Sequence, residues 1–218
     1  MNPWAGDALK LLFGAAGATF LYGGSREIID ATREFTQLTI DPVFFGCGVA
    51  RGDGHPVMVL PGFLASDGYL RTLRGWLGRM DYAPLASGLR RNTGRLAPLA
   101  AQVAERLATA VREHAAPATL VGHSFGGVIA RAVARLHPEL VRQVITLGSP
   151  LRVDAAPLSP SILLTAIYSR SDRIVRHPRA LAPDGAQNLE VTGSHCGMAV
   201  NAQVYRHLAA LLQPPRRS

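Results

Sequence analysis

The sequence feature that most constrains the fold is a strand that turns sharply into a helix at GHSFGG, residues 122–127. Residues 118–121 are short, apolar and partly branched, which predicts a buried strand, and apolar residues recur at helical spacing over residues 128–136. Glycines on both sides let strand and helix approach closely while Ser124 is held at the apex of the turn. The free N–H groups of the following helix point at any anion formed there.

The rest of the chain alternates between strand and helix. This alternation predicts a mostly parallel sheet of about six strands with helices on both faces. Only fourteen residues separate the fourth expected strand from the fifth, so no large cap domain is expected there. The expected strands are 56–60, 82–86, 118–121, 141–147, 162–168 and 188–192, and the helices after residue 50 are 69–77, 96–114, 128–136 and 198–212. The proline in 82–86 favours the edge of the sheet.

The GHSFGG segment resembles the nucleophile elbow of the α/β-hydrolase fold, and more narrowly that of small bacterial lipases and esterases. The resemblance covers about residues 56–213 and implies a minimal version of that fold, preceded by extra N-terminal helices. In this fold a serine, an acid and a histidine follow one another along the chain. The expected catalytic domain is 51–218, with residues 1–50 as a helical extension packed on it or resting on a membrane.

A serine becomes a nucleophile when a base accepts its proton, and His195 stands where that base is needed. It lies between the last expected strand and the last expected helix. His137 and His207 fall at a helix end and inside a helix, where surface or interface positions are expected. His177 follows the predicted acid closely and is the fallback base.

The acid that orients His195 is expected to be Asp172, which directly follows the strand 162–168. It precedes an apolar pair, as the acid of the family does, and Arg170 and Arg173 beside it are expected to help keep it ionised. The alternatives are Asp154 and Asp184. Because a loop aspartate more often forms a turn than takes part in catalysis, position along the chain is what favours Asp172.

An oxyanion hole needs two N–H donors, and the resemblance implies the backbone of Phe125 and of Phe63. Leu64 is the alternative second donor, and the side chains of Phe63 and Leu64 are expected to wall the acyl pocket. Residues 88–92 either reach the rim of that pocket or form a solvated loop.

The implied reaction is cleavage of a carboxylic ester through an acyl-enzyme, with a small-molecule ester or lipid as substrate. Neither a metal nor an organic cofactor is needed. A thioesterase, an acyltransferase, a cofactorless haloperoxidase or a carbon–carbon bond hydrolase would use the same residues. A non-catalytic lipid-binding protein on a hydrolase fold is the alternative from a different class.

Composition narrows the partners further. The chain has 218 residues, which suits one substantial core, and a net charge of +8 that comes almost entirely from arginine. The arginines are scattered and no basic run is interleaved with aromatic residues, so nucleic-acid binding is not expected. Cys47 and Cys196 lack the spacing of a metal site and are expected to be reduced, partly buried thiols, with a single disulfide between them as the alternative.

The N-terminus is the least informative part of the sequence. Residues 1–38 suggest two helices, the second over 25–35 with Ser25 as its cap. Residues 11–25 are uncharged but shorter than the roughly 20 residues that span a membrane. Asp7 and a very short apolar core disfavour a secretory signal, so a cytoplasmic or membrane-peripheral location is favoured over secretion. Residues 43–49 are expected to be a short edge strand or a packed loop.

Overall fold

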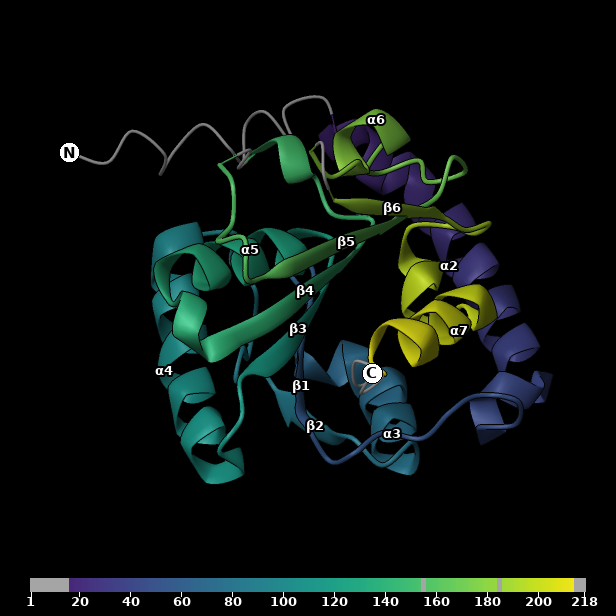
Figure 1. The fold of residues 1–218 in the computed structure, drawn as a ribbon. Coiled ribbons are helices and arrows are strands. Elements are labelled where there is room, and N and C mark those ends of the chain that lie inside the picture. Colours follow the sequence, from purple (N-terminus) through teal and green to yellow (C-terminus); the bar gives the residue numbers. More distant parts are fainter. Residues whose placement is uncertain (1–15, 154–155, 184–185, 214–218) are drawn as a thin grey trace.

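The computed structural model describes residues 16–153, 156–183 and 186–213, with side chains from residue 26 onward (Figure 1). Its centre is one sheet of six parallel strands in the order β2-β1-β3-β4-β5-β6. The strands are β1 (Pro56–Leu60), β2 (Ala83–Ala86), β3 (Ala118–His123), β4 (Val141–Leu147), β5 (Leu163–Tyr168) and β6 (Gln187–Glu190). All six expected strands are confirmed to within two residues, and β2 does lie at an edge of the sheet.

The strand order brings two functional loops together. β1 lies between β2 and β3, so the strand order reverses at the pair β1 and β3. In open α/β sheets, ligands bind beyond the carboxyl ends of the strands at such a reversal. Leu60 at the end of β1 pairs with Gly122 near the end of β3. The loop after β1 and the turn after β3 therefore leave the sheet side by side.

Helices cover both faces of the sheet, each with its own apolar core. α4 (Leu96–His114) and α5 (Phe125–Leu136) lie on one face, whereas α3 (Arg71–Arg79) and α7 (Ala202–Leu211) lie on the other (Figure 1). On the α3 and α7 side the fully buried Trp76 packs on Tyr205 with 4.8 Å between ring centroids. α6 (His177–Ala180) lies beside β5, and short 3-10 helices span Pro42–Phe45, Asp67–Leu70, Pro138–Leu140, Leu151–Val153 and Cys196–Val200.

The final helix differs from the expected span of 198–212. Residues 196–200 form a 3-10 helix, and α7 begins only at Ala202. The interruption is at Asn201, whose Oδ1 accepts hydrogen bonds from the amides of Gln203 and Val204 at 2.9 and 3.3 Å. Asparagine is among the preferred N-cap residues, and this local bond competes with a continuous helix.

The N-terminal segment also differs from expectation. α2 is one helix over Ala16–Ile40, so Ser25 lies in its interior and does not cap it, and the paired glycines at 23 and 24 do not break it. Two glycines cost about 2 kcal/mol of helix propensity. The packing of the C-terminal half compensates, because Glu27, Glu34 and Leu38 share one buried face against residues 196–200. The expected first helix falls mostly outside the described residues.

The segment 43–49 holds no strand: its start is the 3-10 helix Pro42–Phe45, capped by Asp41, whose Oδ1 accepts from the amide of Val43 at 3.0 Å. Within the described ranges, none of the helices combines the length and apolar character that a membrane crossing requires. The division of the chain at residue 50 stays a prediction.

Candidate active site

Ser124 occupies the tip of the turn between β3 and α5 in a strained backbone conformation. Its φ and ψ are 53° and −125°, a region that side-chain-bearing residues rarely adopt and that costs about 1–3 kcal/mol. The amide of Ser124 donates to the carbonyl of Leu147 at 2.8 Å, which ties the tip to the end of β4. A conformation of this kind persists only where the surroundings enforce it, and such sites are often functional.

The glycines around Ser124 are required by close backbone contacts. A Cβ at Gly122 would overlap the backbone of Gly127, and a Cβ at Gly126 would overlap the carbonyl of Leu60. The strand, the helix and the end of β1 are therefore closer here than any side chain would permit. This packing forces the sharp turn and leaves Ser124 at its apex.

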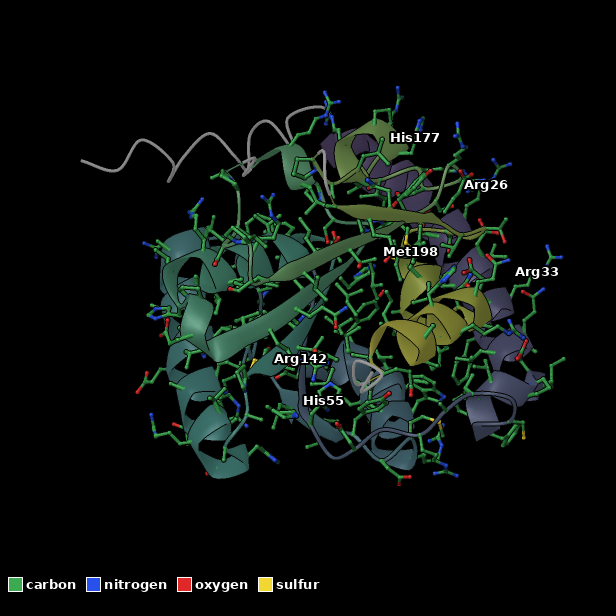
Figure 2. The ribbon with its side chains drawn as sticks, in the orientation of Figure 1. Arg26, Arg33, His55, Arg142, His177 and Met198 are labelled. Atoms are coloured by element: carbon green, nitrogen blue, oxygen red, sulfur yellow. The ribbon has the colours of Figure 1, made fainter. Side chains whose placement is uncertain are left out.

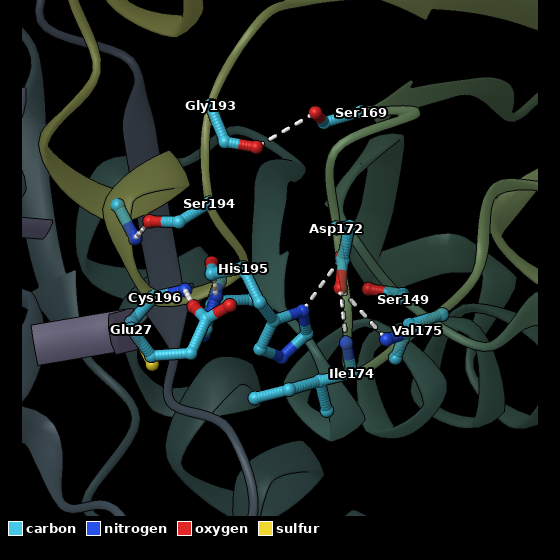
Figure 3. A network of polar contacts seen from close by, with 12 residues as sticks. Glu27, Ser149, Ser169, Asp172, Ile174, Val175, Gly193, Ser194, His195 and Cys196 are labelled. Carbon is cyan, nitrogen blue, oxygen red and sulfur yellow. Dashed lines mark hydrogen bonds and ion pairs between the residues drawn. The ribbon is translucent and has the colours of Figure 1, made fainter. Parts of the chain in front are cut away.

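The loops after β5 and β6 bring Asp172 and His195 together (Figure 3). Both side chains are almost fully buried, and His195 Nδ1 lies 2.7 Å from Asp172 Oδ2. The other carboxylate oxygen, Oδ1, accepts from the amides of Ile174 and Val175, each at 2.8 Å. Because an ionised carboxylate can only accept, it holds the tautomer in which Nδ1 carries the proton and Nε2 is left as the acceptor.

Ser124 and His195 line the same cavity of about 140 Å³. No hydrogen bond joins Ser124 Oγ to the imidazole in the described structure, and such bonds are often long before substrate binds. The remaining wall of the cavity is largely apolar. It includes Phe63, Ala65, Phe125, Pro150, Ile174 and Val175.

The two expected oxyanion donors differ in their surroundings. Phe125 is the first residue of α5, where an amide has no partner within the helix, and Phe63 lines the cavity. The amide of Leu64 donates to the carbonyl of Asn92 at 2.8 Å, so it is already used. The side chain of Leu64 is 44% exposed and is not among the residues that line this cavity. The Leu64 amide is therefore not free to serve as the second donor while this bond is kept.

Asn92 organises the loop after β1, a role that the amino-acid sequence did not indicate. It is fully buried, and its Nδ2 donates to the carbonyl of Pro61 at 2.9 Å. Its amide donates to the carbonyl of Ala65 at 2.8 Å, so the loop is held at three points together with Leu64. Residues 88–92 are therefore not simply a solvated loop: Leu89 and Asn92 are buried while the arginines between them are exposed.

Comparison with known proteins places the chain in a family. A model of the PGAP1-like alpha/beta domain matches residues 99–213, which is more than half of the chain and includes Ser124, Asp172 and His195. The chain belongs to this family.

Solved structures support the α/β-hydrolase fold of this PGAP1-like domain. A structure from the pair LipS and LipT, two metagenome-derived lipolytic enzymes, matches with a TM-score of 0.56 at 15% identity, over 75% of this chain and 95% of its own. A YdeN-like hydrolase from Pectobacterium atrosepticum matches with 0.55 at 19% identity, over 84% and 99%. The thioesterase domain of the curacin biosynthetic pathway matches with 0.52 at 14% identity, over 74% and 92%. At these identities the likeness establishes the fold.

His123, the residue before the apex, lies directly behind the imidazole of His195. The two rings are 4.9 Å apart, and His123 Nε2 donates to the backbone carbonyl of His195 at 2.9 Å. Its Nδ1 is buried without a partner among the described protein atoms. Burial, reinforced by repulsion from His195, lowers the pKa of His123 from 6.5 to about 3. His123 is therefore neutral near pH 7 and braces the loop that carries His195.

Two buried carboxylates of α2, Glu27 and Glu34, contact the same loop from outside the sheet (Figure 3 draws Glu27). Glu27 Oε2 accepts from the amide of Cys196 at 3.1 Å, and burial raises the pKa of this carboxyl. The sequence signal for both was a pair of glutamates seven residues apart, on the helical face that also carries Leu38.

The other candidates of the sequence lie elsewhere. His137 caps the end of α5, His207 lies within α7, and His177 begins α6, where its ring is 6.2 Å from that of Tyr168. Arg170 and Arg173 pair with Glu190 and Asp30 at 3.0 and 3.2 Å rather than with Asp172. Asp154 and Asp184 lie outside the described residues.

Both cysteines are free, Cys196 half-buried as expected and Cys47 exposed. Burial raises the pKa of Cys196 to about 11. No group of three or more histidine, cysteine, aspartate or glutamate side chains suited to a metal ion occurs in the part of the chain that the structure describes.

Proposed function

We propose that this PGAP1-like domain is a serine hydrolase that cleaves carboxylic esters, with Ser124 as nucleophile, His195 as base and Asp172 as the group that orients His195. The observation that carries the proposal is the 2.7 Å contact between His195 Nδ1 and Asp172 Oδ2 at the wall of the cavity that Ser124 also lines. The strained conformation of Ser124 supports it further, because nothing in ordinary packing calls for a serine there.

In the proposed reaction Ser124 Oγ attacks the ester carbonyl carbon while its proton passes to His195 Nε2. The oxyanion accepts hydrogen bonds from the amides of Phe125 and Phe63. The bond to the alkoxy oxygen then breaks, and His195 returns the proton to the leaving alcohol. Water attacks the acyl-enzyme with His195 again as base, which releases the acid and restores Ser124.

The cavity favours esters with short acyl chains. Its volume of about 140 Å³ is well below the roughly 300–1,000 Å³ of drug-sized ligand pockets, and its wall is mainly apolar. We expect turnover of p-nitrophenyl acetate and butyrate to exceed that of octanoate and palmitate. A lipid substrate would place one short chain or only the ester group inside the cavity.

The test is covalent labelling by a fluorophosphonate together with turnover of this ester series. Wild type is expected to be labelled at Ser124 and to hydrolyse the short esters, whereas S124A loses both. H195A is expected to lose turnover by about 10³-fold or more, since residues that act as a unit fail together. Labelling of S124A at the wild-type rate would refute the assignment of the nucleophile.

A thioesterase or an acyltransferase would use the same residues, and substrate comparison separates them. Thioester turnover above ester turnover, or acyl transfer to an added alcohol in preference to water, would redirect the proposal. A non-catalytic lipid-binding protein predicts no labelling of wild type together with lipid binding that S124A leaves unchanged.

We further propose that the outer face of α2 rests on an anionic lipid surface. Ile28, Ile29 and Ile40 of α2 are each more than 60% exposed. Arg26 and Arg33 on the same helix point away from the body of the molecule (Figure 2). Exposed isoleucines together with arginines on one helix are a pattern of interfacial helices, and the net charge of +8 favours anionic lipid.

Vesicle flotation tests this contact. Wild type is expected to float with phosphatidylglycerol vesicles more than with phosphatidylcholine vesicles, and the double variant I28S/I29S to lose that binding. L163S, which removes an equally exposed apolar side chain at the start of β5, is the control. Equal flotation of the double variant and the control would count against the proposal. A wild type that is dimeric in solution while the double variant is monomeric would also count against it.

A further inference from the structure

The loop that carries His195, residues 191–201, is held by a helix from the opposite end of the chain. Glu34 of α2 is 8% exposed, and its Oε1 accepts from both the amide and the hydroxyl of Ser194, at 2.7 and 2.8 Å. Its Oε2 accepts from Asn201 Nδ2 at 2.9 Å. One carboxylate thus bonds the residue directly before His195 and the residue that ends the loop.

The hydrogen bonds continue through the loop on both sides of His195. Ser194 Oγ accepts from the amide of Gly197 at 3.1 Å, which closes a turn around His195. Glu27, two helical turns before Glu34, accepts from the amide of Cys196. The backbone amides immediately before and after His195 therefore both donate to carboxylates of α2.

The loop sequence itself is fitted to the Glu34 carboxylate. A Cβ at Gly193 or at Gly197 would overlap the carboxyl group of Glu34. Glycine is needed at both positions for the carboxylate to approach. Gly193 also has a φ of 149°, a conformation that other residues rarely adopt. A loop that only needed to cover the sheet would require neither glycine.

Burying a carboxylate costs several kcal/mol, and the three bonds to Glu34 offset part of that cost without the gain of an apolar contact. Leu38, one turn further along α2, is fully buried and already supplies apolar docking on the same face. An apolar residue in place of Glu34 could not accept the hydrogen bonds from Ser194 and Asn201.

We propose that Glu34 is a positioning residue for the base, and that α2 is part of the active site. The inference rests on the proposed serine hydrolase function. By fixing Ser194 and Asn201, Glu34 holds the imidazole against Asp172 and in reach of Ser124. A displacement of about 1 Å at such a group can cost about 100-fold in rate.

The experiment compares E34Q with wild type by steady-state kinetics on p-nitrophenyl butyrate and by the rate of fluorophosphonate labelling. E34Q keeps the size of the side chain but turns one acceptor into a donor, which opposes either Asn201 or Ser194. We expect kcat and the labelling rate to fall together by about 10- to 100-fold, with KM within about threefold. E105Q, a glutamate on the exposed side of α4, is the charge-matched control and keeps wild-type values.

The outcomes separate the two proposals. Loss of labelling in S124A with unchanged kcat and labelling in E34Q overturns only the role of Glu34. Labelling of S124A at the wild-type rate overturns the proposed function. A fall in kcat of E34Q that simply tracks a fall in folded fraction, measured by circular dichroism at the assay temperature, assigns Glu34 a structural role and also overturns the proposal.

Should E34Q fail to fold, S194A carries the test. It removes the hydroxyl bond to Glu34 and the bond from the Gly197 amide to that hydroxyl, and it leaves α2 and the Ser194 amide bond to Glu34 in place. Its labelling rate is expected to fall several-fold while KM is unchanged. A rate equal to wild type overturns the proposal.

Discussion

Lowering the pH from 7.5 to 5 is expected to destabilise the native state through His123. This imidazole is only 3% exposed, its Nε2 is committed as a donor to the His195 carbonyl, and the ring of His195 lies 4.9 Å away. A proton added to Nδ1 would place a charge where no described protein acceptor meets it. The pKa of His123 is accordingly lowered to about 3, against 6.5 for an exposed imidazole.

The sign and size of the change in the free energy of unfolding follow from the linkage between protonation and folding. Between pH 6.5 and 3 the unfolded chain binds a proton at this position and the folded chain does not, so the free energy of unfolding decreases as the pH falls. At 1.36 kcal/mol per pH unit below 6.5, the loss at pH 5 is about 2 kcal/mol, and at pH 7.5 it is close to zero. For a marginally stable domain this is a large fraction of the total.

Urea unfolding of wild type and H123Q at pH 5 and pH 7.5 measures the effect. The glutamine amide can keep the donor to the His195 carbonyl but does not titrate, and the other histidines contribute equally to both proteins. The stability of wild type relative to H123Q is expected to drop by about 2 kcal/mol between the two pH values. Parallel pH dependences would refute the claim that His123 is held neutral by burial.

Three further changes have defined outcomes. N92A is expected to lose about 1–3 kcal/mol in urea unfolding, because the Pro61 carbonyl loses its buried partner, and to lower kcat, because Asn92 holds the loop after β1 that carries the proposed donor Phe63; unchanged kcat would argue against that link. At pH 8 a disulfide reagent should modify Cys47 quickly and Cys196 slowly, since a thiol with a pKa of about 11 is only about 0.1% thiolate there; two fast thiols would contradict this. G126A is expected to lose about 1–3 kcal/mol of thermal stability, because its methyl group would press on the backbone at the end of β1; a variant as stable as wild type would contradict this.

The elements that the sequence predicted well are those whose signal is local. The turn at Ser124 announces itself by a buried strand, two glycines and an amphipathic helix within twenty residues. Asp172 and His195 stand directly after predicted strands, and parallel strands bring their ends to one edge of the sheet. Position relative to a strand was therefore enough to predict that these two side chains meet.

The parts that the sequence missed depend on partners distant in the chain. Asn92 looks like an ordinary turn residue until Pro61, thirty-one positions earlier, is seen to accept its side-chain bond. Glu34 meets Ser194 across 160 positions, and no local pattern encodes such a contact. A glutamate on a helix is usually expected to face solvent, so burial of the carboxylate runs against the expectation from residue type.

The predicted helix boundaries were wrong because local signals were present but other contacts overrode them. Ser25 and the glycines before it suggest a helix start, yet tertiary contacts of the C-terminal half of α2 override these weak preferences. At the other end of the chain Asn201 interrupts what apolar spacing alone predicts as one helix, because its side chain serves the loop and the helix at the same time.

The meeting of α2 with the loop at residues 191–201 bears on how this protein can be shortened or tagged. A recombinant version trimmed at residue 50 would retain every strand, the serine and both of its companions, yet would strip the backbone flanking His195 of its two outside acceptors. Expression designs and evolutionary comparisons that start at β1 would therefore discard a segment that looks like an appendage in the sequence, although it contacts the loop that carries His195.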